Sequence, residues 1–412
     1  MGGQGDLYEV RVTTHHRITY QKLVALPSFA QLALRHASSS LMSRADVIVL
    51  GGGIIGCALA EELARRKRRV VVIERGSIGA EASSAAAGIL SAQMDAPTPG
   101  AFFDLCQAAR RAYPAWVARI ERASGQRVGY ARSGVLYLAV SDAQARRMQQ
   151  RAIWQRRLGL RVERWTMAQV RRREPAVDGG FRCGFHFPLE GQVDNALLMR
   201  ALAQACRSAG VRVREQVTAR RLILSQGRVR GVETSQSVIR ADVVVNTLGS
   251  WSPMIAGFPG RLPVEPARGQ IVCLAGPKRL FHRPIMTDRA YLIQRRDGRL
   301  LLGSTVERAG FDKSVTLEGM YAILSGVRTI SSRLDACAYV DSWAGLRPYS
   351  RTGYPILGRT GVEGVYVATG HFRHGILLAP ITAALMTDLI LRGRSSFDLT
   401  PFSLGRFDRK LS

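Results

Sequence analysis

Apolar runs and helical segments alternate at the start of the patterned part of the chain. Residues 46–50 form a short apolar run that leads into a glycine-rich turn, and residues 57–67 have the spacing and composition of a helix. Residues 70–73 are a second apolar run, which ends on Glu74. The pattern predicts a strand, a glycine turn, a helix and a second strand within one unit of roughly 30 residues.

Further strands and helices are predicted along the rest of the chain. Residues 291–304 alternate as strands do, and Asp297-Gly298 within them marks a hairpin turn. The other predicted elements are a strand segment at 129–137, a helix at 196–209, a strand at 211–213, a hairpin at 222–234, a strand and glycine turn at 241–252, a sheet segment at 263–274, a strand at 365–368 and a final helix at 381–392. This mixture of strands and helices indicates an α/β protein.

The composition is typical of a large globular enzyme. The chain has 412 residues, of which 46% are hydrophobic, and this length suggests two domains or more. No run reaches the roughly 18 to 20 apolar residues of a membrane span, and the nearest, 375–391, contains Pro380 and Asp388 and predicts a core helix. The six cysteines form no CxxC pair or metal-spaced cluster, which indicates buried free thiols, a cytoplasmic location and no metal site.

The formal charge of +28 raises the question of a nucleic-acid partner. The basic residues are nearly all arginine, are scattered through helical segments, and are not interleaved with aromatic side chains as a stacking platform requires. We therefore expect no nucleic-acid partner. A flavoprotein that modifies or binds RNA is the alternative from another class, and it predicts salt-sensitive binding.

Residues 1–43 differ from the rest of the chain. They are basic and weakly patterned, and they lack the apolar core and cleavage site of a secretory signal. We expect a disordered extension or a misassigned start, with Met42 as the natural first residue, and a targeting peptide is the alternative.

The glycine turn has the residues that a dinucleotide needs. Gly51 permits a tight turn, Gly53 lets the backbone approach a pyrophosphate, and Gly56 allows the helix to pack closely on the strand. The helix N-terminus attracts negative charge, and Glu74 is placed to accept hydrogen bonds from ribose hydroxyls. A carboxylate here disfavours a 2′-phosphate, which leaves FAD or NAD.

Residues 75–90 favour FAD. They include the small-residue run Glu81-Ala-Ser-Ser-Ala-Ala-Ala-Gly88, which allows close passage beside a bulky ring or a second phosphate. On this run the sequence resembles the D-amino-acid oxidase superfamily of flavoproteins, and within it the glycine oxidases of thiamine biosynthesis. The resemblance covers residues 45–395. No cysteine or histidine matches a covalent flavin link, so we expect noncovalent FAD.

The resemblance implies an interleaved fold, in which a Rossmann-like, GR2-type FAD-binding domain alternates with an α+β substrate domain built on an antiparallel sheet. We assign residues 44–130, 190–260 and 338–395 to the FAD-binding domain, residues 131–189 and 261–337 to the substrate domain, and residues 396–412 to a C-terminal tail. Besides the three glycines and Glu74, the expected cofactor contacts are Ile54, Ile55, Arg75, Ser83, Ser84, Ala86, Ala87, Gly88, Ile89, Ala219, Gly249, His371, His374, Gly375, Ile376 and Leu377.

Three further residues are expected to carry the chemistry. Arg347, in Ala344-Gly-Leu-Arg-Pro348, matches the family arginine that binds the substrate carboxylate, and its planar fork suits that task. The resemblance places the Tyr291 hydroxyl over the same carboxylate and Arg373 close to the substrate. His371 and His374 are not expected to act as general bases, because hydride transfer from a neutral amine needs none.

These residues predict a flavin amine oxidase that converts glycine, O2 and water to glyoxylate, ammonia and H2O2, with an imine that the family supplies to thiazole assembly for thiamine. The alternatives are a sarcosine or D-amino-acid oxidase, a dehydrogenase that passes electrons to a quinone, and an inactive flavin-binding scaffold. Arg289 and Val306 stand where the family sets pocket size, and the extra cation would admit a different or more acidic amino acid. Whether the protein forms a homo-oligomer stays open.

Overall fold

The computed structural model describes residues 44–407, so the predictions for residues 1–43 and for the end of the tail lie outside the described residues.

A six-stranded sheet has the order β18-β19-β12-β1-β2-β8, and it is parallel except for the edge strand β18. Its strands are β1 (Val47–Leu50), β2 (Val70–Ile73), β8 (Arg212–Arg214), β12 (Val243–Asn246), β18 (Ile356–Arg359) and β19 (Val365–Thr369).

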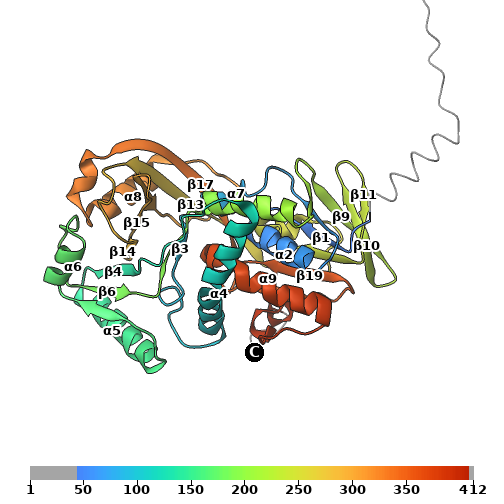
Figure 1. Ribbon diagram of the computed structural model, residues 1–412, viewed down its shortest axis with the longest axis horizontal. Helices are drawn as coiled ribbons and strands as arrows, with labels where there is room; N and C mark the ends of the chain where they lie inside the picture. The colour runs from blue at the N-terminus through green and yellow to red at the C-terminus, as the bar shows by residue number, and fades with distance from the viewer. Residues whose placement is uncertain (1–43, 408–412) are drawn as a thin grey trace, which may run out of the picture. The chain divides into compact units, whose positions relative to one another are not determined.

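The two faces of this sheet bury alternate residues of the same strands, as period-two geometry requires. Val47 and Val49 pack under a layer of helices, whereas Ile48 and Leu50 pack under a small antiparallel sheet. The helices are α2 (Ile54–Arg65), α4 (Ala101–Ser124), α7 (Asn195–Ser208) and α9 (Gly375–Arg392), and the small sheet consists of β9 (Ala219–Ser225), β10 (Arg228–Thr234) and β11 (Val238–Arg240). Figure 1 shows these two layers around β1 and β19.

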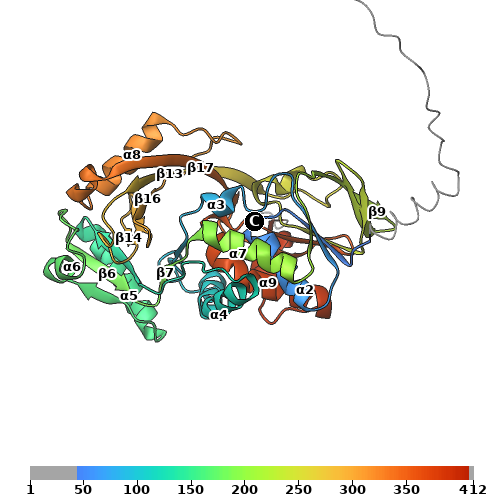
Figure 2. The ribbon, with the colours of Figure 1, turned by 45° about the horizontal axis from the view of Figure 1, so that its top comes forward.

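An eight-stranded, mostly antiparallel sheet forms the other half of the described residues, with the order β17-β13-β16-β15-β14-β4-β6-β5. Its strands are β4 (Val135–Ala139), β5 (Glu163–Trp165), β6 (Cys183–Phe187), β13 (Val264–Ala275), β14 (Ile285–Met286), β15 (Tyr291–Gln294), β16 (Arg299–Gly303) and β17 (Ala338–Ser350). It carries α5 (Asp142–Arg157), α6 (Met167–Arg173) and α8 (Leu317–Arg328). Figure 2 shows β13 and β17 arching from this half toward the short helix α3 (Ala82–Ala85) of the other half.

The predicted α/β fold with a Rossmann-like unit is confirmed, and the hairpins at 222–234 and 291–304 form as expected. Residues 338–350, which we assigned to the FAD-binding domain, form β17 and pair with β13 along its length. The chain returns to the first sheet with β18. The domain division stays a prediction.

Helix α9 begins at Gly375, earlier than the predicted residue 381, and runs through Pro380. Burial against α2 and α4 outweighs the one backbone hydrogen bond that a proline removes. Among the described residues, the segment Phe372–Arg392 is long and apolar enough to cross a membrane, but 61% of its 18-residue apolar stretch is buried within the protein. A buried core helix can have the same length and apolar composition.

The C-terminal segment packs on the first sheet as far as it is described. Phe402 is fully buried and lies near Tyr354, with ring centroids 6.5 Å apart. This part of the predicted tail therefore contributes to the core.

Candidate functional site

A cavity of about 510 Å³ lies where the two large sheets meet. One wall comes from the carboxyl ends of β1, β2, β12 and β19, which is where open α/β sheets bind ligands. The other wall comes from β13, β15 and β17, with Gly269, Tyr291 and Arg347. The volume is within the usual range of small-molecule and cofactor sites.

The glycine turn provides close backbone approach at the first wall. Gly51 has φ +99°, and a Cβ there would lie 2.7 Å from the carbonyl oxygen of Thr247. A Cβ on Gly56 would lie 2.0 Å from the carbonyl oxygen of Gly51, so only glycine lets α2 pack this tightly behind the turn. Gly53 lines the cavity beside Ser83.

Glu74 and Ser83 lie at the two places where a dinucleotide needs polar groups. The Glu74 carboxylate accepts hydrogen bonds from the backbone N–H of Gly52 (2.7 Å) and of Gly76 (2.8 Å), and each oxygen keeps a lone pair for a ribose hydroxyl. The expected free N–H groups at the start of α2 are partly used, because Ile54 donates to Ser83 Oγ at 2.9 Å. The turn, the acid and the hydroxyl fit the adenosine diphosphate half of FAD.

Arg75 and Trp251 contact each other and line the same cavity as Glu74. The Arg75 guanidinium lies 3.8 Å from the Trp251 ring centroid and pairs with Glu81 at 2.7 Å. Trp251 and Glu81 were not predicted, since a tryptophan after a glycine turn and an acid in a small-residue run carry no specific sequence signal. Both line the cavity.

The small-residue run forms α3 and the short strand β3 (Ile89–Leu90), which pairs with β7 (Gly191–Gln192). Ser83, Ala86, Ala87, Gly88 and Ile89 all line the cavity, as expected for a segment that passes beside a ring. Gly88 has φ +76°, and a Cβ there would lie 2.1 Å from the carbonyl oxygen of Val193. The run therefore lies close against the segment that leads into α7.

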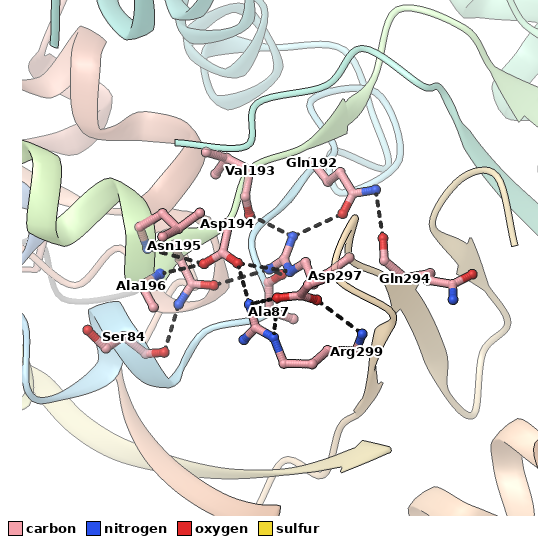
Figure 3. Close-up of polar contacts among 12 residues, drawn as sticks. Ser84, Ala87, Gln192, Val193, Asp194, Asn195, Ala196, Gln294, Asp297 and Arg299 are labelled. Carbon is pink, nitrogen blue, oxygen red and sulfur yellow. Dashed lines mark hydrogen bonds and ion pairs between the residues drawn. The ribbon is translucent and has the colours of Figure 1, made fainter. Parts of the chain in front are cut away.

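Arg295, which no sequence signal marked, holds this run in place. Figure 3 shows four of the residues that it contacts: Ala87, Gln192, Val193 and Asn195. Its side chain is 5% exposed, and it donates to the carbonyl oxygens of Ala87 (2.6 Å) and Val193 (2.9 Å) and to Gln192 Oε1 (2.9 Å) and Asn195 Oδ1 (3.3 Å). Burial lowers its pKa to about 10. Among so many arginines, no sequence signal distinguishes this one.

We expect Arg295→Met to lower the free energy of unfolding by about 3 to 5 kcal/mol, because buried carbonyl and amide oxygens lose their donor. Urea unfolding at a fixed excess of FAD measures the loss. Arg299→Met is the matched control. Arg299 pairs with Asp194 at 3.0 Å, as Arg295 does at 3.8 Å, but its side chain is 40% exposed, and we expect a loss of about 1 kcal/mol or less. Equal losses in the two variants would contradict the prediction.

Arg347 and Tyr291 lie together at the second wall, and two glycines make room for them. A Cβ on Gly269 would lie 2.1 Å from Arg347 Nη1, and a Cβ on Gly303 would lie 2.4 Å from the Tyr291 hydroxyl. Arg347 donates from Nη1 to the Thr305 carbonyl oxygen (2.9 Å) and from Nη2 to Ser304 Oγ (2.8 Å), which fixes the guanidinium plane.

Burial determines the electrostatics of this pair. Burial lowers the pKa of Arg347, and the nearby Arg373 guanidinium lowers it further. Burial also raises the pKa of Tyr291, so its hydroxyl is a neutral hydrogen-bond donor at pH 7. Arg373 also lines the cavity, and its guanidinium lies 5.0 Å from the Phe372 ring centroid. The three residues expected to carry the chemistry thus share one cavity, and their roles stay predictions.

His371 and His374 are held neutral. Burial lowers the pKa of His371 to about 3 and that of His374 to about 4. His371 lines the cavity, with Nε2 3.1 Å from Thr382 Oγ1. His374 does not line it, and its Nε2 lies 3.7 Å from Oδ2 of Asp95, which does. Groups of such low basicity are poor proton acceptors at pH 7.

The two histidines predict a dependence of stability on pH. Their unfolded pKa is about 6.5, so between about pH 6.5 and pH 4 the unfolded chain binds protons that the folded protein does not. Stability therefore falls as the pH falls through this window, by up to about 1.4 kcal/mol per pH unit for each group. We expect the free energy of unfolding, measured with urea at several pH values, to fall less steeply with falling pH in His374→Phe than in the parent protein. Parallel curves for the two proteins would contradict this.

Five expected cofactor contacts do not line the cavity: Gly56, Ser84, Ala219, His374 and Leu377. Gly56 packs α2 on β1, and the Ser84 carbonyl accepts a hydrogen bond from Asn195 at 2.7 Å. Ala219 begins β9 on the face of the sheet away from α2, and Leu377 is buried among the core helices. The other expected contacts line the cavity.

The described part of the chain, residues 44–407, contains no cluster of His, Cys, Asp and Glu that could hold a metal ion. None of its cysteines lines the cavity, and noncovalent attachment of FAD stays a prediction.

Comparisons with known proteins agree with this geometry. Residues 46–389 match the family model DAO, FAD dependent oxidoreductase. Glycine oxidase from Geobacillus kaustophilus is 33% identical over 367 residues, which are 88% of this chain and 97% of that protein. Its crystal structure superposes with a TM-score of 0.85 and 32% sequence identity, and the match covers 88% of this chain and 99% of that one.

The bifunctional protein ThiO/ThiG from Synechocystis is 36% identical over 375 residues. These residues are 89% of this chain but 55% of that protein, so the chain spans about half the length of this relative. The family model covers most of the chain, and the cavity fits its cofactor, FAD. The chain belongs to the DAO family of FAD-dependent oxidoreductases.

Proposed function

We propose that this protein is a glycine oxidase, which converts glycine, O2 and water to glyoxylate, ammonia and H2O2. The observation that carries the proposal is the Arg347 fork beside Tyr291, in the same cavity as the dinucleotide cradle. Similarity along nearly the whole length of a glycine oxidase supports it. Similarity to ThiO/ThiG supports a role in thiamine biosynthesis, in which the imine formed before hydrolysis is used for the thiazole.

Bound FAD supplies the hydride acceptor of the reaction. Arg347 binds the carboxylate of glycine, because its five N–H groups outnumber the hydrogen bonds that it makes to Ser304, Thr305 and Tyr291. Tyr291 donates its hydroxyl hydrogen to the same carboxylate and limits access of water. Together they position the α-carbon for hydride transfer.

The low pKa values of His371 and His374 leave no strong base in the loop that carries them. Glycine therefore reacts as the neutral amine, whose nitrogen lone pair forms the imine bond as the hydride departs from the α-carbon. Water then hydrolyses the imine to glyoxylate and ammonia.

Anaerobic titration of the purified holoenzyme with glycine, sarcosine and D-alanine tests the proposal. We expect glycine to bleach the flavin absorption band, and admission of air to restore it with release of H2O2. Recovery with a quinone but not with O2 would identify a dehydrogenase instead. If none of the three amines bleaches the bound flavin, the proposed function is wrong although the fold stands.

We also propose that the enzyme acts in the cytoplasm, without a nucleic-acid or membrane partner. Within residues 44–407, five of the six cysteines are buried free thiols, as expected in a reducing compartment. Many surface arginines pair with acids, including Arg69 with Asp46 and Arg147 with Asp288. A homo-oligomer is compatible with this proposal.

A further inference from the structure

Arg289 lies at the cavity wall two residues before Tyr291 and has an exposed side chain. Its backbone is fixed in a tight turn, because Thr287 Oγ1 accepts hydrogen bonds from the N–H groups of Arg289 (3.2 Å) and Ala290 (3.1 Å). Ala290 packs against Gly326 of α8, where a Cβ would lie 2.9 Å from it. These contacts hold the main chain at Arg289 in place and leave its guanidinium available to a ligand.

Across residues 44–407, the Arg289 guanidinium forms no hydrogen bond and no ion pair. The neighbouring acid, Asp288, is committed elsewhere, since it accepts hydrogen bonds from Tyr137 (2.7 Å), Gln144 (2.9 Å) and Arg147 (2.7 Å). By contrast, Arg75 of the same cavity is neutralised by Glu81.

Arginines and acids both line the cavity, but among the described residues no acid pairs with the Arg289 guanidinium. Arg347 suffices to bind the carboxylate of glycine, and Arg373 lines the cavity beside it. An unpaired guanidinium at a cavity wall has five N–H donors in a planar fork that matches a carboxylate. A substrate with a second carboxylate would satisfy it.

We propose that Arg289 binds the second carboxylate of amines that carry two, such as iminodiacetate, and so extends the substrate class beyond glycine. The proposal rests on the amine oxidase function proposed above. Hydride leaves one α-carbon of iminodiacetate for the flavin, the nitrogen forms an imine, and water cleaves the carbon–nitrogen bond to give glyoxylate and glycine. O2 takes the two electrons and becomes H2O2. Glycine then reacts in turn, so each iminodiacetate consumes two O2 at completion.

The kinetic test compares iminodiacetate with sarcosine, which has the same framework without the second carboxylate. In the holoenzyme we expect a higher kcat/KM for iminodiacetate than for sarcosine, and we expect Arg289→Gln to lower this ratio by about 10-fold or more, mainly through KM. Arg308→Gln is the control, because Arg308 is exposed and close in sequence but does not line the cavity, and it should leave the ratio unchanged. A ratio that Arg289→Gln leaves unchanged would overturn the proposal.

A binding test separates this proposal from the proposed function. Thiodiacetate and (methylthio)acetate replace the amine by sulfur, so their binding to the oxidised holoenzyme is followed through the flavin spectrum without turnover. We expect thiodiacetate to bind more tightly, and Arg289→Gln to remove the difference. This result would support the second carboxylate site even if glycine were not oxidised, and equal affinities in the parent protein would refute it.

Discussion

Replacing Arg347 with methionine is expected to lower kcat/KM for glycine by about 10²- to 10³-fold, with FAD still bound. The variant loses a charge-assisted, bidentate contact with the substrate carboxylate, and removing one partner of a buried charge pair costs about 3 to 5 kcal/mol because the other charge is left uncompensated. The loss appears in both KM and kcat, because the carboxylate also orients the α-carbon toward the flavin. Steady-state oxygen consumption measures it.

Arg347→Lys separates charge from geometry in the same position. Lysine keeps the positive charge but cannot hold Ser304 Oγ, the Thr305 carbonyl and a carboxylate in one plane, so we expect an activity between the parent and the methionine variant. The flavin content and spectrum of each variant show whether the cofactor site is intact. A methionine variant within 10-fold of the parent would remove Arg347 from the site.

The dinucleotide unit was predictable because its signals are local. The run from Gly51 to Glu74 contains the turn, helix and acid within one short segment, and each residue type follows from a backbone or charge requirement. The structure places Gly51, Gly53 and Glu74 at one cavity. The turn, helix and acid alone left either FAD or NAD as the cofactor. The comparisons confirm FAD and identify the family.

Contacts between distant segments were not predictable in the same way. Arg295 holds Ala87, which is 208 residues away, and Gly269 makes room for Arg347 across two paired strands. The sequence around Arg295 is that of an ordinary hairpin, and its buried environment arises only when the two sheets meet. The same holds for β17, whose partner β13 precedes it by more than 60 residues of chain.

Residues 338–350 show the same limit. We assigned them to the FAD-binding domain, but as β17 they pair with β13, which lies in the range assigned to the substrate domain. A residue at a cavity between two sheets can come from either sheet. Arg347 pairs with Ala267 of β13 and still lines the cavity. Position in the site therefore does not determine the sheet that supplies the residue.

Gly56→Ala is expected to weaken FAD binding about as strongly as Arg347→Met lowers kcat/KM for glycine. A Cβ at this position would lie 2.0 Å from the Gly51 carbonyl oxygen and 2.6 Å from Thr247 Oγ1, so α2 must move away from β1. This movement displaces the turn that approaches the pyrophosphate. We expect FAD affinity to fall by about 100-fold or more, since misfits of this kind in packed cores cost roughly 1 to 3 kcal/mol and the phosphate contacts are lost as well.

Gly361→Ala is the matched control, because no atom lies within 4 Å of the added Cβ and the backbone there is not in the left-handed region. Flavin fluorescence during titration of the apoprotein with FAD measures both affinities, and circular dichroism shows whether each variant is folded. If folded Gly56→Ala binds FAD as tightly as Gly361→Ala, close packing of α2 on the glycine turn is not what forms the cofactor site. A 100-fold difference between two single methyl additions would show that this packing determines FAD binding.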